Sequence, residues 1–250
     1  MLCRRTRVVP PPSMYAAAAA GAALIGGLAF AAMNGRVTLA SAVAASPVRP
    51  LKFVTGSQPC VHDMPAADGA FLAEHGVTIK PLSPIGAEVR GIDLRQKPPE
   101  QVLSVLESAM AVRGFIVFKE QGILSGDEQV DASEYWGGRQ MHSTHGVHPE
   151  APNRHIFRLA NDRSVGILGV GPQWHNDGSF ERAVFSHVGY HIVRVAERGG
   201  GTIFAHQGAA YDALPPEEQQ RWERLASVNS NSGVLHPLVH EHPISGRNWA

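Results

Sequence analysis

Cysteine is almost missing from this 250-residue sequence. The two cysteines, Cys3 and Cys60, both lie within the first 62 residues, and residues 63–250 contain none. The larger part of the chain therefore has neither an internal disulfide framework nor a zinc site with cysteine ligands. The cysteine count says little about the cellular compartment.

Acidic residues are missing from residues 1–62, which contain no Asp or Glu. The basic residues of this segment are Arg4, Arg5, Arg7, Arg36, Arg49 and Lys52. The whole chain has 22 basic and 22 acidic residues, so residues 63–250 carry 16 basic residues against 22 acidic, a net charge of −6. A mildly acidic domain of this kind gives no reason to propose a nucleic acid as partner.

An alanine-rich apolar run at residues 16–33 follows the basic start, and small residues in A-x-A patterns follow at 40–44. An acid-free segment rich in Arg and Ala is typical of an organelle transit peptide, and we favour targeting to a mitochondrion or plastid. A secretory signal and a retained membrane anchor are the alternatives. We expect residues 1–62 to be a leader, with any membrane contact confined to it, and the mature protein to begin between about Ala40 and Val61.

The first half of residues 63–250 contains sequence patterns typical of both strands and helices. Alternating residues with Pro and Gly turns predict strands within residues 77–94, and an apolar stripe predicts a helix over 99–113. The apolar stretch FIVF at 115–118 predicts a short buried strand. A serine followed three residues later by a glutamate predicts a capped helix over about 125–136.

The second half contains more loop and strand signals. Residues 137–172 are loop-rich and dense in histidine, and β-branched and aromatic residues predict strands at 183–195 and 202–206. Prolines followed by acidic residues predict a helix over 214–228, and residues 233–250 are strand-like with a Pro-Ile-Ser-Gly turn. Strand and helix do not alternate regularly, so we expect a mainly β fold with flanking helices, a sandwich or barrel.

The stretch QWHNDGSF, residues 173–180, places His175 and Asp177 two residues apart. On a strand, residues at this spacing face the same side. Two histidines and one carboxylate hold Fe(II) in oxygenases and leave positions open for a cosubstrate and O2. Taken alone, a lone His-x-Asp is explained more simply as a surface turn with a His–Asp hydrogen bond.

The motifs around this pair carry a family resemblance. WHNDGSF is followed by GGGTIFAHQGAAYDALPPEEQQRW and LHPLVHEHPISGR, and is preceded by IKPLSPIGAEVRGIDL and RGFIVFKEQ. In this order they resemble the taurine dioxygenase (TauD/TfdA) family of Fe(II)- and 2-oxoglutarate-dependent oxygenases, over nearly all of residues 63–250. The resemblance implies a double-stranded β-helix, or jelly roll. It also implies oxidation of a small substrate by O2, with 2-oxoglutarate converted to succinate and CO2.

The resemblance also implies roles for individual residues. His175 and Asp177 match the first two Fe(II) ligands of the family. Thr202, in GGGT, matches the residue whose hydroxyl group donates to a 2-oxoglutarate carboxylate, with a spacing from the histidine that fits the family. His148 resembles a histidine that reaches the substrate in some members, although a solvated loop histidine is an equal alternative.

The third iron ligand and the arginine that binds 2-oxoglutarate follow, in the family, the segment that LHPLVHEHPISGR resembles. We therefore expect the jelly roll to be incomplete at its carboxyl end, and a 250-residue chain to have little or no oxygenase activity. His236, His240 and His242 are weak substitutes for the missing ligand. Two alternatives remain: a non-catalytic remnant, and a metal protein that uses a local histidine without 2-oxoglutarate. The substrate and the oligomeric state cannot be predicted from the sequence.

Overall fold

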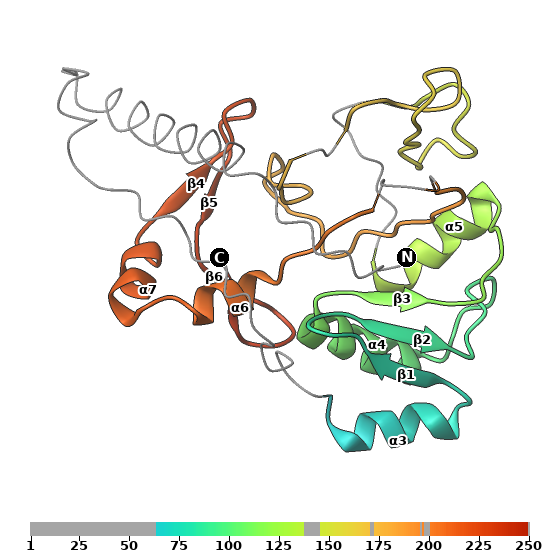
Figure 1. Ribbon diagram of the computed structural model, residues 1–250, viewed down its shortest axis with the longest axis horizontal. Helices are drawn as coiled ribbons and strands as arrows, with labels where there is room; N and C mark the ends of the chain where they lie inside the picture. The colour runs from blue at the N-terminus through green and yellow to red at the C-terminus, as the bar shows by residue number, and fades with distance from the viewer. Residues whose placement is uncertain (1–63, 138–145, 171–172, 196, 198–200, 250) are drawn as a thin grey trace. The chain divides into compact units, whose positions relative to one another are not determined.

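The computed structural model describes residues 64–137, 146–170, 173–195, 197 and 201–249 (Figure 1). The leader expected over residues 1–62 lies outside the described residues, so its targeting role stays a prediction. None of the helices within the described ranges has both the length and the apolarity needed to cross a bilayer.

A three-stranded sheet with two helices forms the first part of the described chain. The helix α3, Ala66–Glu74, precedes strand β1, Thr78–Pro81, which pairs antiparallel with β2, Ala87–Arg90. The helix α4, Glu100–Arg113, then leads to β3, Ile116–Phe118, which pairs parallel with β2. The helix serves as the crossover that a parallel connection requires (Figure 1). The strands expected within residues 77–94 and at 115–118, and the helix over 99–113, are therefore confirmed.

The core of this part lies between α4 and the sheet. The side chains of Val102, Leu106 and Ala109 recur at helical spacing and are each no more than 1% exposed. In β2, Ala87 and Val89 are buried, whereas Glu88 and Arg90 are only partly buried, as the alternation of a strand requires. The buried cluster consists of Leu72, Val77, Val89, Val102 and Leu106.

Arg113 continues the buried stripe of α4 and is itself only 1% exposed. Its Nε donates to the carbonyl oxygen of Gly86 at 3.0 Å, and its guanidinium also donates to the carbonyl oxygen of Leu82. Gly86 has φ 85°, and the Phe115 ring occupies the place that a Cβ atom would need. A buried cation therefore fixes the turn between β1 and β2 to the end of α4.

The helix α5, Gly126–Ser133, begins with a capping box and runs into a 3₁₀ turn, Glu134–Trp136. The Ser125 hydroxyl accepts from the Glu128 amide at 3.2 Å, and the Glu128 carboxylate accepts from the Ser125 amide at 2.7 Å. Both hydrogen bonds satisfy backbone amides that have no intrahelical partner at the start of a helix. The helix expected over 125–136 is confirmed together with its capping residues.

Replacing Ser125 by alanine is expected to lower the free energy of unfolding by about 1 kcal/mol, because the Glu128 amide loses its acceptor. The measurement is urea unfolding followed by circular dichroism. Ser104→Ala is the matched control, since Ser104 is an exposed residue inside α4 and should change stability by less than about 0.5 kcal/mol. Equal effects of the two substitutions would contradict the capping role.

The last part of the described chain contains short helices and two-stranded sheets. Its elements are α6, Gln207–Asp212; α7, Pro216–Trp222; β4, Ala226–Val228; β5, Leu235–Pro237; β6, His240–Glu241; and β7, Asn248–Trp249. The pairs β4–β5 and β6–β7 are antiparallel. The helix expected over 214–228 is real but shorter, because β4 takes up its last residues. Short strands with a turn between β6 and β7 confirm the strand-like end of the chain.

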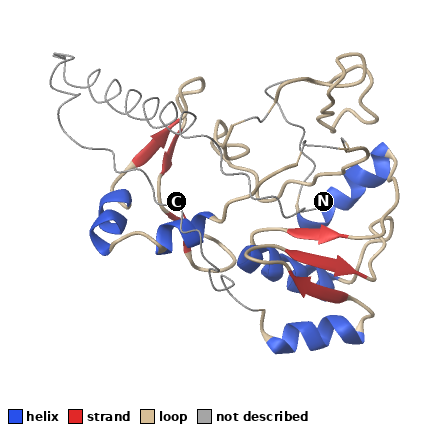
Figure 2. Cartoon of the chain, in the orientation of Figure 1, coloured by secondary structure: helices blue, strands red, loops and turns tan. Residues whose placement is uncertain are grey.

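The strands expected at 183–195 and 202–206 are wrong: both segments are loop in the structure (Figure 2). Several of their apolar side chains stay in solvent, including Val184 and Ile203 at 56% and 69% exposed. A strand needs hydrogen bonds from a neighbouring strand as well as suitable side chains, and these segments pair with no strand of the described chain.

The mainly β architecture is accordingly realised only in part. The strands of the described residues form three separate sheets of three, two and two strands. None of these sheets closes into a barrel, so the expected jelly roll is not completed within the described chain. Helices α3 to α7 make up much of the regular structure instead.

Candidate metal centre

The side chain of His175, in a loop, meets that of Asp177, the first residue of a turn at residues 177–180. The distance from His175 Nε2 to Asp177 Oδ1 is 3.2 Å, and the side chains are 51% and 26% exposed. Two ligands that each lie about 2.1 Å from one ion at a right angle stand about 3 Å apart. The spacing of the two atoms therefore suits neighbouring positions on one metal ion.

The hydrogen bond of the other ring nitrogen determines which nitrogen of His175 carries the lone pair. Its Nδ1 lies 2.7 Å from the carbonyl oxygen of Gln173, and a carbonyl can only accept, so Nδ1 carries the proton. In the neutral ring Nε2 is then a lone-pair donor that faces the carboxylate of Asp177. Two facing lone-pair donors at this distance suit a shared cation, either a proton or a metal ion.

Tyr190 holds the second oxygen of the carboxylate. Its hydroxyl donates to Asp177 Oδ2 at 2.5 Å. Loss of solvent around the hydroxyl raises the pKa of Tyr190, and the hydrogen bond to Asp177 and the charge of its carboxylate raise it further. The phenol therefore remains a donor at neutral pH, and Oδ1 is left to face His175.

Asn176, between the two candidate ligands, connects the loop to α6. Its Oδ1 accepts from Gln207 Nε2 at 2.8 Å. Thr202 lies five positions before Gln207 in the sequence. The Thr202 side chain is exposed and makes no hydrogen bond to another residue of the described chain.

Gly178 allows the chain to turn directly behind Asp177. Its φ is 79°, and a Cβ atom would lie 2.9 Å from the Phe185 ring. The turn is closed by a hydrogen bond from the Glu181 amide to the Gly178 carbonyl at 3.0 Å, and Phe180 packs edge-on to Phe185. The glycine thus fixes the direction of the backbone that carries the carboxylate.

Replacing Gly178 by alanine is expected to weaken binding of a divalent cation about tenfold, because the turn behind Asp177 must shift. The measurement is a Co(II) titration followed by visible absorption. Gly189→Ala is the control, since a Cβ at Gly189 meets nothing within 4 Å and the residue has no left-handed backbone. If both variants bind Co(II) like the original chain, the turn does not position the carboxylate.

His148 lies on a separate loop and uses both ring nitrogens within it. Its Nδ1 accepts from the Glu150 amide at 3.1 Å, and its Nε2 then donates to the Arg163 carbonyl at 3.1 Å. The ring lies beside an open cavity of about 280 Å³. The residues that line this cavity are His148, Arg163, Gly166, Ile167 and Leu168. In this arrangement His148 closes the loop and has no ring nitrogen left for a substrate.

A third metal ligand is not assembled near the pair by the residues that the structure describes. His236 Nε2 lies 2.9 Å from the Glu181 carbonyl, to which it donates. The ring of His242 packs on Trp249 at 4.6 Å, and its Nδ1 accepts from the Ser245 amide. The residues present therefore fit two protein ligands of an iron centre and not the full set of three.

The supporting residues of the pair were missed by sequence reasoning. Tyr190 lies 13 residues after Asp177, and Gln207 lies 31 residues after Asn176. No sequence spacing indicates such contacts, because both depend on how the loop after the pair folds back. Gly178 was the one detectable signal, since a glycine directly after a candidate ligand indicates a special turn.

A family comparison covers most of the chain. Residues 78–248 match the sequence model of the family described as "Taurine catabolism dioxygenase TauD, TfdA family". The alpha-ketoglutarate-dependent sulfonate dioxygenase of Saccharomyces cerevisiae is 26% identical over 231 residues, which cover 78% of this chain and 54% of the yeast protein. The alpha-ketoglutarate-dependent 2,4-dichlorophenoxyacetate dioxygenase of Cupriavidus pinatubonensis is 28% identical over 209 residues, 69% of this chain and 72% of that enzyme. The chain thus spans about half the length of the yeast relative.

Two solved structures are also similar to this chain. The crystal structure of AAD-2 in complex with Mn(II) and N-oxalylglycine has a TM-score of 0.50 and 25% identity, covering 69% of this chain and 68% of that one. A taurine dioxygenase from Burkholderia xenovorans also has a TM-score of 0.50, with 22% identity over 69% of this chain and 61% of its own. The likeness in fold supports the expected architecture, although the described residues form no closed sheet.

Proposed function

This chain belongs to the TauD/TfdA family of 2-oxoglutarate-dependent dioxygenases, and we propose that its function is that of an Fe(II)- and 2-oxoglutarate-dependent oxygenase, whose activity requires one iron ligand beyond the two that the described residues supply. The proposed reaction oxidises a small organic molecule with O2 and releases succinate and CO2. One observation carries the proposal most directly: His175 Nε2 and Asp177 Oδ1 face each other at 3.2 Å, with the histidine held by Nδ1.

The proposed roles follow from the donor atoms. His175 and Asp177 would hold Fe(II), at which O2, the oxidant, would be activated while 2-oxoglutarate supplies two of the electrons; protein side chains cannot supply this chemistry. Thr202 would donate its hydroxyl hydrogen to a 2-oxoglutarate carboxylate, since a hydroxyl can offer one such bond. The Asn176–Gln207 bond supports this role, because it holds the segment after Thr202 against the loop of the pair.

The substrate that we propose is a small organic anion. The names of the relatives specify a sulfonate, a sulfate ester and a chlorinated aryloxyacetate, which are all anionic. The proposal for His148 as a substrate contact is the weaker one, because both of its ring nitrogens are engaged within its own loop. A substrate contact would require that loop to open.

A second candidate function is binding without turnover, as in a non-catalytic remnant of the family. The observation in its favour is that no third histidine, cysteine, aspartate or glutamate joins the pair within the described ranges. A chain of this kind would still bind a divalent cation and 2-oxoglutarate, but would convert neither cosubstrate nor substrate.

The two candidates are separated by measuring succinate formed from 2-oxoglutarate with Fe(II) in air. The assay is repeated over a panel of organosulfonates, alkyl sulfates and aryloxyacetates. An oxygenase should release succinate in proportion to oxidised substrate, and His175→Ala should abolish the release. His75→Ala is the matched control, because His75 is exposed and its Nδ1 also bonds a backbone carbonyl, at 2.9 Å. Cation and 2-oxoglutarate binding without succinate would support the binding function.

A further inference from the structure

We infer that Tyr190 is a positioning residue for Asp177: its hydroxyl holds Oδ2, so that Oδ1 alone is presented to a divalent cation shared with His175. This inference rests on the proposed metal role of the pair. It adds a residue of this chain that neither the His-x-Asp spacing nor the family resemblance indicated.

Each of the four polar side-chain atoms of the pair has a neighbour. His175 Nδ1 is bonded to the Gln173 carbonyl at 2.7 Å, and Asp177 Oδ2 is bonded to the Tyr190 hydroxyl. The two remaining atoms, Nε2 and Oδ1, face each other at 3.2 Å. Each ligand is therefore oriented by one hydrogen bond to its outer atom, which is how partners outside the coordination sphere fix metal ligands.

The Tyr190 side chain contributes little to packing. The residue is 51% exposed, and the neighbours that alternate with it, Val188 and Ile192, are 47% and 45% exposed. Its ring thus lies in a segment that buries little apolar surface, and the hydroxyl contact with Asp177 is the specific interaction that it makes. Removing the hydroxyl should change the orientation of the Asp177 carboxylate, and should have little effect on the stability of the fold.

Without the Tyr190 hydroxyl, both oxygens of Asp177 become available and the carboxylate can rotate. The cation then loses a preoriented ligand, and a carboxylate can bind through both oxygens instead of one. Loss of an orienting partner of this kind typically lowers metal affinity by about 10–100-fold. Binding through both oxygens also raises the coordination number, which weakens the visible absorption of Co(II).

The test is an anaerobic Co(II) titration of Tyr190→Phe, followed by visible absorption, beside His175→Ala and the original chain. Tyr135→Phe is the matched control, because the Tyr135 hydroxyl also makes one hydrogen bond, to the Leu94 carbonyl at 2.9 Å, in a different part of the fold. We expect Tyr190→Phe to bind Co(II) about 10–100-fold more weakly and with a weaker absorption band at saturation. Tyr135→Phe should leave both quantities unchanged.

The possible results separate the inference from the function on which it rests. If His175→Ala weakens binding and Tyr190→Phe does not, the positioning role is wrong and the metal pair stands. If neither substitution weakens binding, the cation lies elsewhere and both ideas are wrong. If Tyr190→Phe lowers affinity only in step with a lowered unfolding temperature and keeps the original spectrum, Tyr190 is structural and the inference is overturned.

Discussion

Replacing His175 and Asp177 together by alanine is expected to lower the affinity of the chain for Fe(II) or Co(II) by at least about 100-fold. The physical reason is that both facing donor atoms, Nε2 and Oδ1, disappear at once. Loss of supporting partners alone costs about 10–100-fold, so loss of the ligands themselves should cost more. Each single substitution should come close to the double one, because ligands of one ion act as a unit.

The measurement is a titration with Co(II), read by visible absorption and repeated by calorimetry. His75→Ala is again the control, since it removes an exposed histidine with the same kind of Nδ1 hydrogen bond. If the double variant keeps the affinity of the original chain, the pair is a surface turn with a His–Asp contact. That simpler explanation was the alternative from the sequence alone.

Replacing Arg113 by methionine is expected to lower the free energy of unfolding by about 3 kcal/mol. The substitution keeps an apolar chain of similar length but removes the donors that bond the carbonyl oxygens of Gly86 and Leu82. Hydrogen bonds from a charged group contribute about 1.5–3 kcal/mol each. The Gly86 carbonyl keeps its bond from the Leu82 amide at 2.9 Å, whereas the Leu82 carbonyl loses the guanidinium donor. The turn between β1 and β2 should open first.

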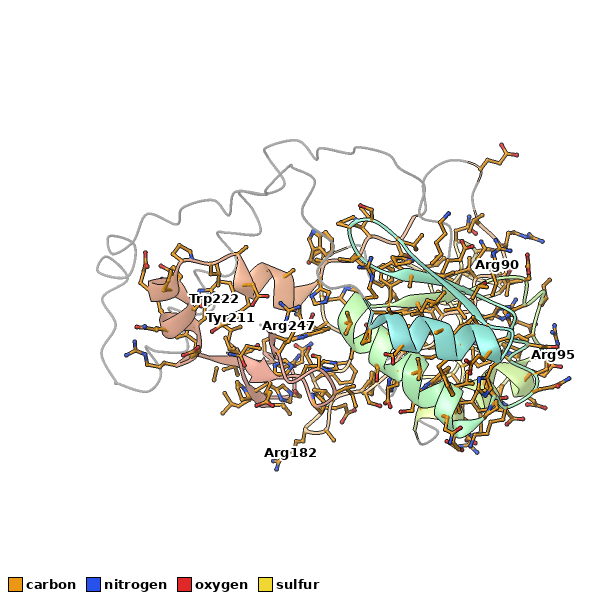
Figure 3. All side chains as sticks on the ribbon, turned by 90° about the horizontal axis from the view of Figure 1, so that it is seen from below. Arg90, Arg95, Arg182, Tyr211, Trp222 and Arg247 are labelled. Carbon is orange, nitrogen blue, oxygen red and sulfur yellow. The ribbon has the colours of Figure 1, made fainter. Side chains whose placement is uncertain are left out.

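Urea unfolding measures this loss, and Arg182→Met is its control. Arg182 is exposed and extends away from the rest of the chain in Figure 3. The control substitution should change stability by less than about 0.5 kcal/mol. If Arg113→Met is equally neutral, the two carbonyl contacts do not stabilise the fold, and packing of the arginine stem alone accounts for its burial.

Local signals in the sequence predicted the first part of the fold well. The helix α4 follows from an apolar stripe that ends at Gly114, whose φ of 84° is the left-handed conformation common after helices. The start of α5 follows from Ser125 and Glu128. These features depend on residues within about one helical turn of each other, so the sequence contains nearly all the relevant information.

The incorrect or missing predictions concern contacts between residues that are distant in the sequence. The β-branched residues at 183–195 indicate an extended backbone, but pairing depends on a partner strand that local pattern does not reveal. The burial of Arg113 likewise depends on carbonyls at least 27 residues away. A charged residue at the end of a helix would ordinarily be expected in solvent.

The candidate site was likewise predictable only where its residues are close in the sequence. The spacing of His175 and Asp177 indicated two side chains on one side of the chain, and the structure brings them together even though the segment is a loop. Their role as ligands, like the cosubstrate role of Thr202, stays a prediction. Tyr190 and Gln207 could not be predicted, because the loop that brings them to the pair has no regular repeat.

The most direct test of the shared metal ion is a crystal structure of the protein loaded with Co(II), with anomalous data collected at the cobalt edge. We expect a peak about 2.1 Å from both His175 Nε2 and Asp177 Oδ1, with the Tyr190 hydroxyl still on Oδ2. A cobalt peak bound by other residues, with the His175 and Asp177 side chains joined only to each other, would contradict this expectation.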